Sequence, residues 1–271
     1  MGCHRVPTRA TVSAIALLLA VMAASLGGCA SYVVPGGPAD FRALGITASE
    51  QEARTDAVIA VAMSREPAAS FPARIAVARL QDAGYRNYSG YGYGSGRVTV
   101  QTVRDVESDE DFQRLADLPQ VAGIAQLNRL VLPNTINDAE DLRVAAAQVK
   151  ADMLLVYTFD TTFGVETIVP VLGTITLGLF PSEESRVNTT CSLALIDVRT
   201  GYIYGLGESS AKAEQLASGW TSSTAIDQSR RRAEAEAFTG AVDEFVSLWQ
   251  GIAAEYSRPA SPIGVRYETP G

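Results

Sequence analysis

The sequence predicts an α/β fold: a mixed β-sheet covered by helices, with a central β-hairpin and a long C-terminal amphipathic helix. Three stretches carry this prediction: a hairpin pattern over Cys191–Leu206, a nearly continuous apolar run over Ala151–Asp160, and an apolar stripe with helical spacing within Thr224–Tyr256. A strand–helix–strand succession ahead of the hairpin is typical of a parallel pair. Because hairpin strands are antiparallel, the sheet should be mixed.

The first residues have the pattern of a secretion signal over 1–28. Arg5 and Arg9 precede an apolar run, Ala14–Leu26, which is short for a membrane span and closely followed by glycines. The stretch Leu26-Gly-Gly-Cys29 resembles the lipobox of bacterial lipoproteins. That resemblance implies cleavage before Cys29 and acylation of its thiol and new amino group, giving durable membrane attachment. An ordinary signal with a chance cysteine is the alternative.

The residue after the cysteine is Ala30. Under enteric-type lipoprotein sorting, an Asp at this place would retain the protein at the inner membrane. The resemblance therefore implies the outer membrane, with the folded part on its periplasmic face, ahead of the inner membrane.

Charge and composition limit the partners. Removal of residues 1–28 takes away two arginines and no acidic residue, which leaves 20 basic and 30 acidic side chains and a formal charge of −10. This balance argues against a nucleic-acid partner and against polybasic adhesion to lipid. We expect a membrane contact through the N-terminal lipid and an envelope protein as partner.

Cysteine and histidine usage excludes several kinds of site. With Cys3 in the signal and Cys29 acylated, Cys191 is alone and predicted to be a small buried residue. The only histidine, His4, also lies in the signal, so the mature chain has no Ser-His, Cys-His or histidine–zinc site. We predict no catalytic residue, no cofactor and no metal. A hydrolase using the carboxylates Asp105, Asp109 or Asp160 is the less favoured alternative.

The remaining chain divides into a lipidated tether over 29–46, one α/β periplasmic domain over 47–256 and a loosely ordered, proline-containing tail over 257–271. Ser49-x-x-Glu52 is a capping box for a helix from Glu50 to about Arg65. Its small apolar side chains predict close packing on another element.

Two strands with an unusual connection follow. Ala73–Leu80 suits a half-buried strand, and the alternation in Arg97–Arg104 predicts an edge strand. The connection Tyr85–Gly96 alternates tyrosine and glycine, which predicts a flexible hairpin loop. The alternative is an adaptable recognition loop in which Tyr91 and Tyr93 contact a partner.

Acidic residues from Asp105 to Asp111 could be a calcium loop, but the required glycine and closing glutamate are missing. They better suit the start of a helix over Asp109–Leu118 with Ser108 as its cap. Val121–Leu132 then predicts one or two strand pieces. Asn137-x-x-Glu140 predicts the cap of a helix over Asp138–Val149.

The stretch Gly164–Phe180 is apolar and broken by Pro170, Gly173 and Gly178, which argues against a membrane helix. It is either a hairpin buried on the domain or an exposed flap that docks a partner or the bilayer surface. The candidate contacts in the flap are Ile168, Val169, Leu172, Leu177, Leu179 and Phe180.

In the hairpin, Asp197 should cap the turn and Gly201 should supply a positive φ. The last helix has an apolar stripe at residues Phe238, Ala241, Phe245, Leu248 and Ile252, with Val242 and Trp249 at its edge. For Arg230–Arg232 we expect a solvated helix face with i,i+4 pairs rather than an anion site.

Two longer patterns resemble known families. The stretch Arg143–Tyr157, followed by Ser192–Gly201 and a long helix, resembles the curli-assembly, penicillin-binding-protein-activator and TolB N-terminal folds. The stretches Ser70–Arg79, Thr158–Phe163 and Ile175–Pro181 together resemble the rhombotarget lipoprotein family. Neither resemblance implies a catalytic residue. The sequence thus predicts a non-enzymatic, lipid-anchored binding or assembly module; an oligomeric curli-type export component is the alternative.

Overall fold

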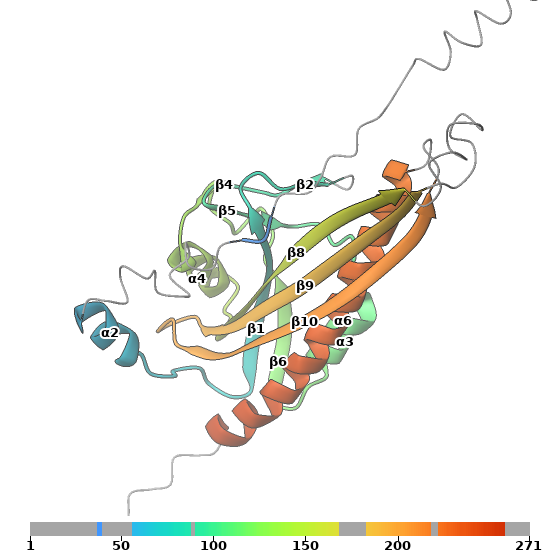
Figure 1. Ribbon diagram of the computed structural model, residues 1–271. Coiled ribbons are helices and arrows are strands. Elements are labelled where there is room, and N and C mark those ends of the chain that lie inside the picture. Colours follow the sequence, from blue (N-terminus) through green and yellow to red (C-terminus); the bar gives the residue numbers. More distant parts are fainter. Residues whose placement is uncertain (1–36, 40–55, 88–89, 168–182, 218–221, 258–271) are drawn as a thin grey trace, which may run out of the picture. The chain divides into compact units, whose positions relative to one another are not determined.

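The computed structural model describes residues 37–39, 56–87, 90–167, 183–217 and 222–257 (Figure 1). These residues form a six-stranded mixed sheet with helices and a long C-terminal helix that packs on it, which confirms the predicted fold class. The predicted signal, most of the tether, the start of the first helix, the flap residues 168–180 and the tail beyond residue 257 lie outside the described residues.

The main sheet has a simple strand order. It runs β10 (Ile203–Ala217), β9 (Glu183–Asp197), β8 (Met153–Thr167), β1 (Ala73–Asp82) and β5 (Val98–Gln101), and β6 (Val121–Gln126) also pairs with β1. β1 is parallel to β6 and β8, and the other pairings are antiparallel. Two small sheets join β2 (Arg86–Asn87) to β3 (Gly90–Tyr91) and β4 (Ser95–Gly96) to β7 (Thr135–Ile136).

β1 is a central strand, so the prediction of a half-buried strand was wrong. Ile75 and Val77 face one layer of the core, whereas Ala76 and Ala78 face the other. The small alanines let a second layer approach as closely as the first. The strands before and after the predicted helix Asp138–Val149, which are β6 and β8, were expected to form a parallel pair. They run in the same direction, but β1 lies between them and pairs with both.

The predicted edge strand is confirmed only over β5. Its four residues pair with the end of β1 and their side chains are buried. The preceding chain lies directly on them, because a Cβ atom at Gly92 would stand 2.2 Å from Thr99 Oγ1. The glycine is therefore required for this close approach.

The helices are α2 (Asp56–Met63), α3 (Asp109–Ala116), α4 (Ala139–Gln148) and α6 (Ser222–Tyr256). Ser108 caps α3 as predicted, since its Oγ accepts a hydrogen bond from the Asp111 amide. At α4 the predicted cap is wrong by one residue. Asp138 accepts from two amides of the first turn, whereas the Asn137 amide donates to the Asp141 carboxylate.

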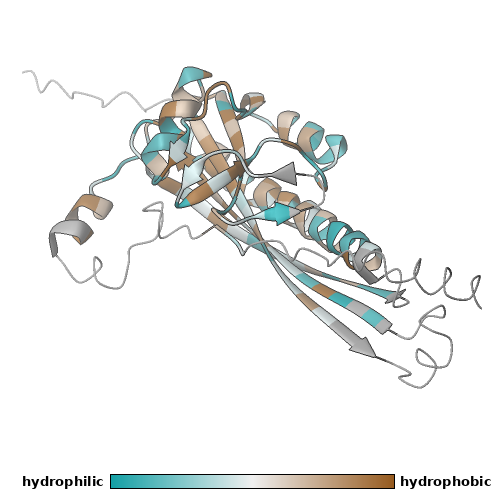
Figure 2. Cartoon of the chain, turned by 90° about the horizontal axis from the view of Figure 1, so that it is seen from above, coloured by the Kyte–Doolittle hydropathy of each residue, from teal (hydrophilic) through white to brown (hydrophobic). Residues whose placement is uncertain are grey.

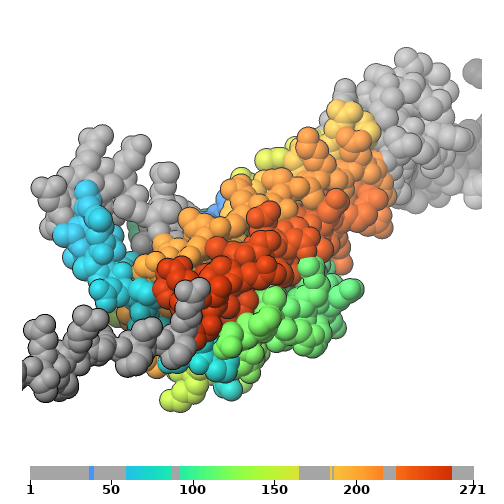
Figure 3. Space-filling model, turned by 90° about the horizontal axis from the view of Figure 1, so that it is seen from below, coloured from blue at the N-terminus to red at the C-terminus, as the bar shows by residue number. Residues whose placement is uncertain are grey.

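The long helix α6 packs against β9 and β10 on one face of the sheet, with α3 beside it (Figure 3). The predicted apolar stripe is buried, but Trp249, predicted at its edge, lies at its centre. Trp249 is fully buried and its Nε1–H donates to the Pro119 carbonyl at 2.7 Å, whereas Leu248 lies at the edge. The opposite face of the sheet is covered by α4 through Leu142, Ala145 and Ala146.

The hairpin turn is built as predicted around Asp197. One carboxylate oxygen accepts from the Arg199 and Thr200 amides, and Gly201 has a φ of 72°. The other oxygen accepts from the Ala68 amide at 2.7 Å and from the Tyr204 hydroxyl at 2.9 Å. Asp197 therefore also fastens the chain that leads into β1, a contact that local sequence did not indicate.

Candidate functional site

Three strands continue past the rest of the sheet. β8 pairs with β1 only over Met153–Val156, but with β9 over its whole length. From that point on, β8, β9 and β10 pair only with one another, over Tyr157–Thr167, Glu183–Leu193 and Gly207–Ala217, which we call the arm (Figure 1). Its end leads into residues 168–182, which contain the predicted flap.

The arm has one covered face and one open face. Toward α6 it presents buried side chains such as Phe159, Val187 and Cys191. The residues that alternate with these along the strands are polar, and most of the coloured part of the arm's strands is teal or pale in Figure 2. Strand register aligns the side chains of the open face in two rows, Asp160–Thr190–Ser210 and Thr162–Asn188–Lys212. The row before them starts at Thr158, which is buried and accepts a hydrogen bond from the Ala39 amide at 2.9 Å.

These two rows bring hydroxyl, amide, carboxylate and ammonium groups together on one face. Thr190 Oγ1 and Ser210 Oγ lie 2.8 Å apart, and Asp160, Thr162, Asn188 and Lys212 are exposed. Cross-strand neighbours of this kind stabilise the sheet while leaving donors and acceptors open to a partner. The open face is thus suited to contacts with another polar surface.

The covered side of the arm starts at a buried ion-pair cluster around Arg79 of β1 and Arg230 of α6. Both side chains are almost fully buried, at 2% and 0% exposure. Asp105 contacts both, at 2.7 Å from Arg79 and 3.1 Å from Arg230, and Glu234 also contacts both, at 3.4 and 2.6 Å. Glu107 lies 3.2 Å from Arg79.

Hydroxyl groups connect this cluster to the strands. Tyr157 donates to Glu107 at 3.0 Å, and Thr161 on the arm donates to Glu234 at 3.1 Å. Tyr85 accepts from Arg79 at 2.9 Å. The cluster therefore ties β1, the chain before α3, α6 and the first residues of the arm together, and it fixes where the arm leaves the sheet.

The charges shift one another's protonation. Burial alone would raise the pKa of Asp105, but Arg79 and Arg230 outweigh it and hold the pKa below its usual value. Burial raises the pKa of Glu234, an effect that the two arginines offset only in part. Burial also raises the pKa of Tyr85 to about 12. The carboxylate of Asp105 is thus ionised and held by arginine.

For Arg230 the predicted solvated face was wrong; Arg231 and Arg232 are exposed as expected. The i,i+4 spacing to Glu234 is correct, yet the pair is buried. A signal was present in the sequence, because Arg230 and Glu234 continue the apolar stripe of α6 toward its N-terminus. Arg79 likewise follows Ile75 and Val77 on one face of β1.

The three acidic residues of the hydrolase alternative do not meet. Asp105 is enclosed between the sheet and α6, Asp109 has a side chain that is 91% exposed and bound to Arg104, and Asp160 lies on the open face of the arm. Within the described ranges, no group of three potential metal ligands is arranged around a common point.

The predicted contact residues have different outcomes. Tyr93 is half-buried: its hydroxyl donates to Asn134 at 2.8 Å and the Arg129 guanidinium lies 5.7 Å from its ring. The backbone of Tyr91 belongs to β3. The six flap residues and the predicted lipidation site, Cys29, lie outside the described part.

Cys191 is buried as predicted, and burial raises the pKa of its thiol.

A void between the sheet and α6 is too small and too apolar to be a ligand site. Side chains of Leu155, Cys191, Phe238 and Phe245 are among those that line it, and its volume of about 10 Å³ is close to the least that holds one water molecule.

Among the described residues, no helix is both long and apolar enough to span a membrane.

Comparison with known proteins gives only distant likenesses. No family model matches the chain, and no curated protein matches it significantly. A Caulobacter crescentus protein provisionally described as a lipoprotein is 14% identical, with 43% of this chain and 79% of that chain covered and a TM-score of 0.26. Lipoprotein GNA1162 from Neisseria meningitidis is 15% identical, with 68% and 99% covered and a TM-score of 0.25. At these scores the likeness carries no argument about function.

Proposed function

We propose that this chain is a non-enzymatic lipoprotein of the bacterial envelope, anchored through acyl chains on Cys29, that binds a protein partner or helps an assembly. The observation that carries the proposal is the arm: an aligned polar face, open along three strands and fixed at its base, leading into the apolar residues 168–182. Open polar rows beside an apolar segment have the composition of a protein interface with a polar rim.

The lipobox pattern Leu26–Cys29 supports the anchor, with Ala30 favouring the outer membrane. The narrower resemblance to the rhombotarget lipoprotein family is part of the same proposal. Carboxylates that are held by arginine or separated on two sides of the sheet favour binding over bond-making chemistry.

The test is site-specific photo-crosslinking in intact cells. Crosslinkers placed at Thr162 and Asn188 on the open face should capture the same envelope protein, whereas one at Glu110 on α3, which is also exposed, should not. Deleting Ile168–Leu179 should abolish the capture and leave the circular dichroism spectrum intact. Equal capture from all three sites would count against the arm as the binding surface.

The anchor is tested separately. Globomycin, which blocks lipoprotein signal cleavage, should leave a larger precursor, and the mass of the mature N-terminus should show acyl chains on Cys29. If the protein has the same size with and without globomycin, the lipoprotein assignment is wrong.

One feature supports an oligomeric export component as the second candidate. β10 is the last strand of the sheet, and among the described residues its outer edge makes no backbone pairing; the Glu214 carbonyl accepts from Arg232 instead. Open strand edges can pair with another copy. Native mass spectrometry in detergent that finds only monomer would exclude this candidate.

A further inference from the structure

The first described segment of the chain, residues 37–39, lies where β8 separates from β1. Pro38 forms an antiparallel bridge with Gln81, the second-last residue of β1. On its other side the Ala39 amide donates to Thr158 Oγ1 of β8 at 2.9 Å, in a buried position. The segment therefore fills the gap between the two strands at the base of the arm, and both strands hold it.

The Gly37 carbonyl accepts two hydrogen bonds in this gap. The Asp82 amide donates to it at 3.3 Å. The buried side-chain amide of Gln81, oriented to suit its neighbours, donates to it at 3.1 Å and to the Phe159 carbonyl of β8 at 3.3 Å. Because this network bonds the segment to both strands, the chain enters the folded domain at Gly37 in a fixed direction.

The strand pairing gives this direction. Residues 37–39 run antiparallel to β1, and β1 is parallel to β8. When the register is continued, Ala39 lies level with Thr158 and Gly37 lies level with Asp160, which is nearer the tip of the arm. The chain that precedes Gly37, and that leads back to Cys29, therefore leaves the segment on the side of the arm.

The tether is about as long as the rest of the arm. Seven residues, 30–36, separate Cys29 from Gly37, so these two residues are at most about 29 Å apart. From the level of Gly37, β8 continues for seven residues from Asp160 to Thr167, or about 23 Å. A tether that keeps its initial direction thus places the anchor at the level of the arm's tip.

The hairpin turn is harder to bring to the same bilayer. Seven residues of β8 also separate the level of Gly37 from Met153, which pairs with Asp197 at the start of the turn. The turn continues to Gly201, whose carbonyl accepts from Arg65 just after α2. To reach this end, the tether would have to reverse its direction and run fully extended over the body of the domain.

The charge of the arm argues against a direct contact with lipid. Arg186 lies 2.9 Å from one carboxylate of the arm and 3.5 Å from another. A net negative surface is repelled by anionic headgroups, whereas a basic protein surface complements it. The charged side chains described in the arm are four acidic and two basic ones: Asp160, Glu184, Glu208, Glu214, Arg186 and Lys212.

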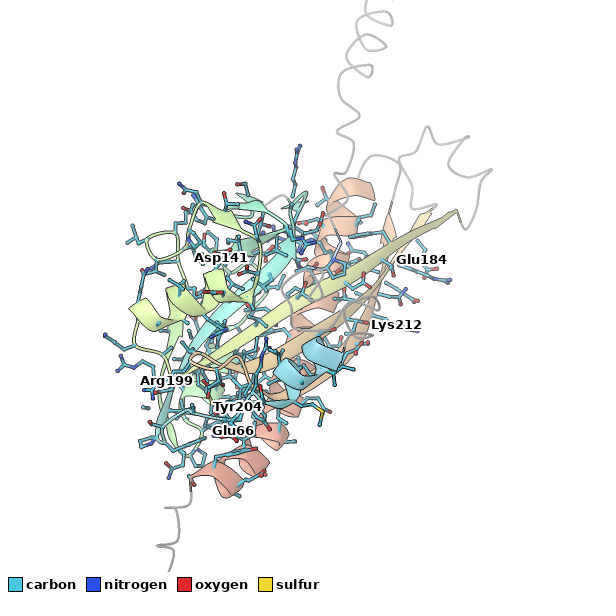
Figure 4. All side chains as sticks on the ribbon, turned by 90° about the vertical axis from the view of Figure 1, so that its left-hand side faces the viewer. Glu66, Asp141, Glu184, Arg199, Tyr204 and Lys212 are labelled. Atoms are coloured by element: carbon cyan, nitrogen blue, oxygen red, sulfur yellow. The ribbon has the colours of Figure 1, made fainter. Side chains whose placement is uncertain are left out.

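We propose that the arm points toward the bilayer that holds the acyl chains, and that the partner on its open face is a protein embedded in that bilayer, with a basic polar surface beside its membrane-spanning part. The proposal rests on the Cys29 anchor of the proposed function and names the class of partner. The hairpin turn then points away from the bilayer. Figure 4 shows the two ends, with Lys212 and Glu184 on the arm and Arg199 and Tyr204 at the turn.

The orientation is tested by energy transfer to the bilayer surface. The mature lipoprotein is reconstituted into phosphatidylethanolamine vesicles that contain an acceptor dye on a lipid headgroup. A donor dye is attached to Lys212→Cys or, as the matched control, to Arg199→Cys. Both substitutions replace an exposed basic residue, and the buried Cys191 does not compete for the dye.

The expected result is stronger transfer from residue 212, by about twofold or more, because the two sites lie about 30 Å apart along the strands. Inserting about 20 Gly and Ser residues after Ser31 should reduce the difference, because a long flexible linker lets the domain turn. Equal transfer from both sites, stronger transfer from residue 199, or a difference that the insertion leaves unchanged would each count against the proposal.

The class of partner is tested in intact cells. A photo-crosslinker at Asn188 should capture a protein that, in uncrosslinked cells, stays in the membrane fraction after a carbonate wash. Glu208→Lys on the arm should lower this capture severalfold, whereas Glu110→Lys, equally exposed on α3, should not. A captured protein that the wash releases, an adduct with lipid alone, or capture that Glu208→Lys leaves unchanged would overturn the assignment of the partner.

A second form of the chain separates the orientation from the anchor. A hexahistidine tag in place of Cys29, bound to a nickel-chelating lipid, holds the tether at the same residue without acylation. Stronger transfer from residue 212 in this form, with no acyl chain found on Cys29 of the natural protein, would refute the anchor and leave the direction of the tether standing. Acyl chains on Cys29 together with equal transfer from both sites would refute the orientation alone.

Discussion

Arg79 on β1 and Arg230 on α6 share the carboxylate of Asp105, whose Oδ1 lies 2.7 Å from the first guanidinium and whose Oδ2 lies 3.1 Å from the second. Glu234 also contacts both, at 3.4 and 2.6 Å. Two cations with almost no contact with water are thereby held side by side. Each guanidinium has exchanged its hydration for contacts with these carboxylates, so the loss of a shared anion leaves buried positive charge less well compensated.

Replacing the shared anion should therefore destabilise the fold. Asp105→Asn removes the negative charge from between two buried cations, so we expect a loss of about 3–5 kcal/mol in the free energy of unfolding. Urea unfolding followed by circular dichroism measures it. The control is Asp109→Asn, which removes an exposed ion pair with Arg104 and should cost less than about 1 kcal/mol. Equal losses in the two variants would contradict the central role of Asp105.

Acid should weaken the hairpin turn. Burial alone would raise the pKa of Asp197, but amides of Ala68, Thr200 and Arg199 and the Tyr204 hydroxyl hold it below its usual value. Because the folded pKa lies below the unfolded one, the stabilisation is complete above about pH 4 and is lost as the pH falls through the folded value. Urea midpoints measured from pH 6 downward should fall less steeply for Asp197→Asn than for the natural protein. Identical slopes would show that this carboxyl does not contribute.

Two glycines should respond to alanine in opposite directions. A Cβ at Gly92 would stand 2.2 Å from Thr99 Oγ1, so Gly92→Ala should cost about 1–3 kcal/mol through overpacking. A Cβ at Gly251, on the exposed side of α6, would meet nothing within 4 Å. Gly251→Ala should therefore stabilise the protein by about 0.5–1 kcal/mol through helix propensity. Thermal unfolding measures both effects: the midpoint temperature should fall for Gly92→Ala and rise for Gly251→Ala.

The start of α4 allows a test of the corrected cap. Asp138→Ala removes the acceptor of two amide hydrogen bonds and should cost about 1 kcal/mol. Asn137→Ala leaves its own amide free to donate to Asp141, so it should be close to neutral. Chemical denaturation of the two variants measures their free energies of unfolding. A larger loss of stability for Asn137→Ala than for Asp138→Ala would show that Asn137 is the cap, as the sequence predicted.

The elements that sequence predicted well are those with a long local pattern. The first half of β8 is a nearly continuous apolar run, α6 has a repeated stripe, and the turn from Asp197 to Gly201 needs only residues that are neighbours in the chain. The extension of β8 from Thr161 to Thr167 was not predicted, and its last four residues belong to the stretch assigned to the flap. The pattern of such segments depends on their own periodicity, so one sequence is enough to find them.

The candidate site was harder because its contacts are not local. Arg230 pairs with Glu234 one helical turn away in either a solvated or a buried environment, and only the arrival of Arg79 and Asp105 from more than 100 residues earlier decides between them. The rows of the arm's open face likewise depend on strand register. The spacing of residues within one segment predicts neither the burial of Arg230 nor the alignment of side chains across the arm.

The tip of the arm and the hairpin turn lie at opposite ends of the same strands. β9 starts at Glu183 near the tip of the arm and ends at Asp197 in the turn, and its 15 residues span about 45 Å at the usual rise per residue. The number of residues in β9 therefore sets the distance between the turn and whatever meets the arm's tip. Adding a pair of residues to each of β8, β9 and β10 would lengthen that distance without turning any side chain to the other face.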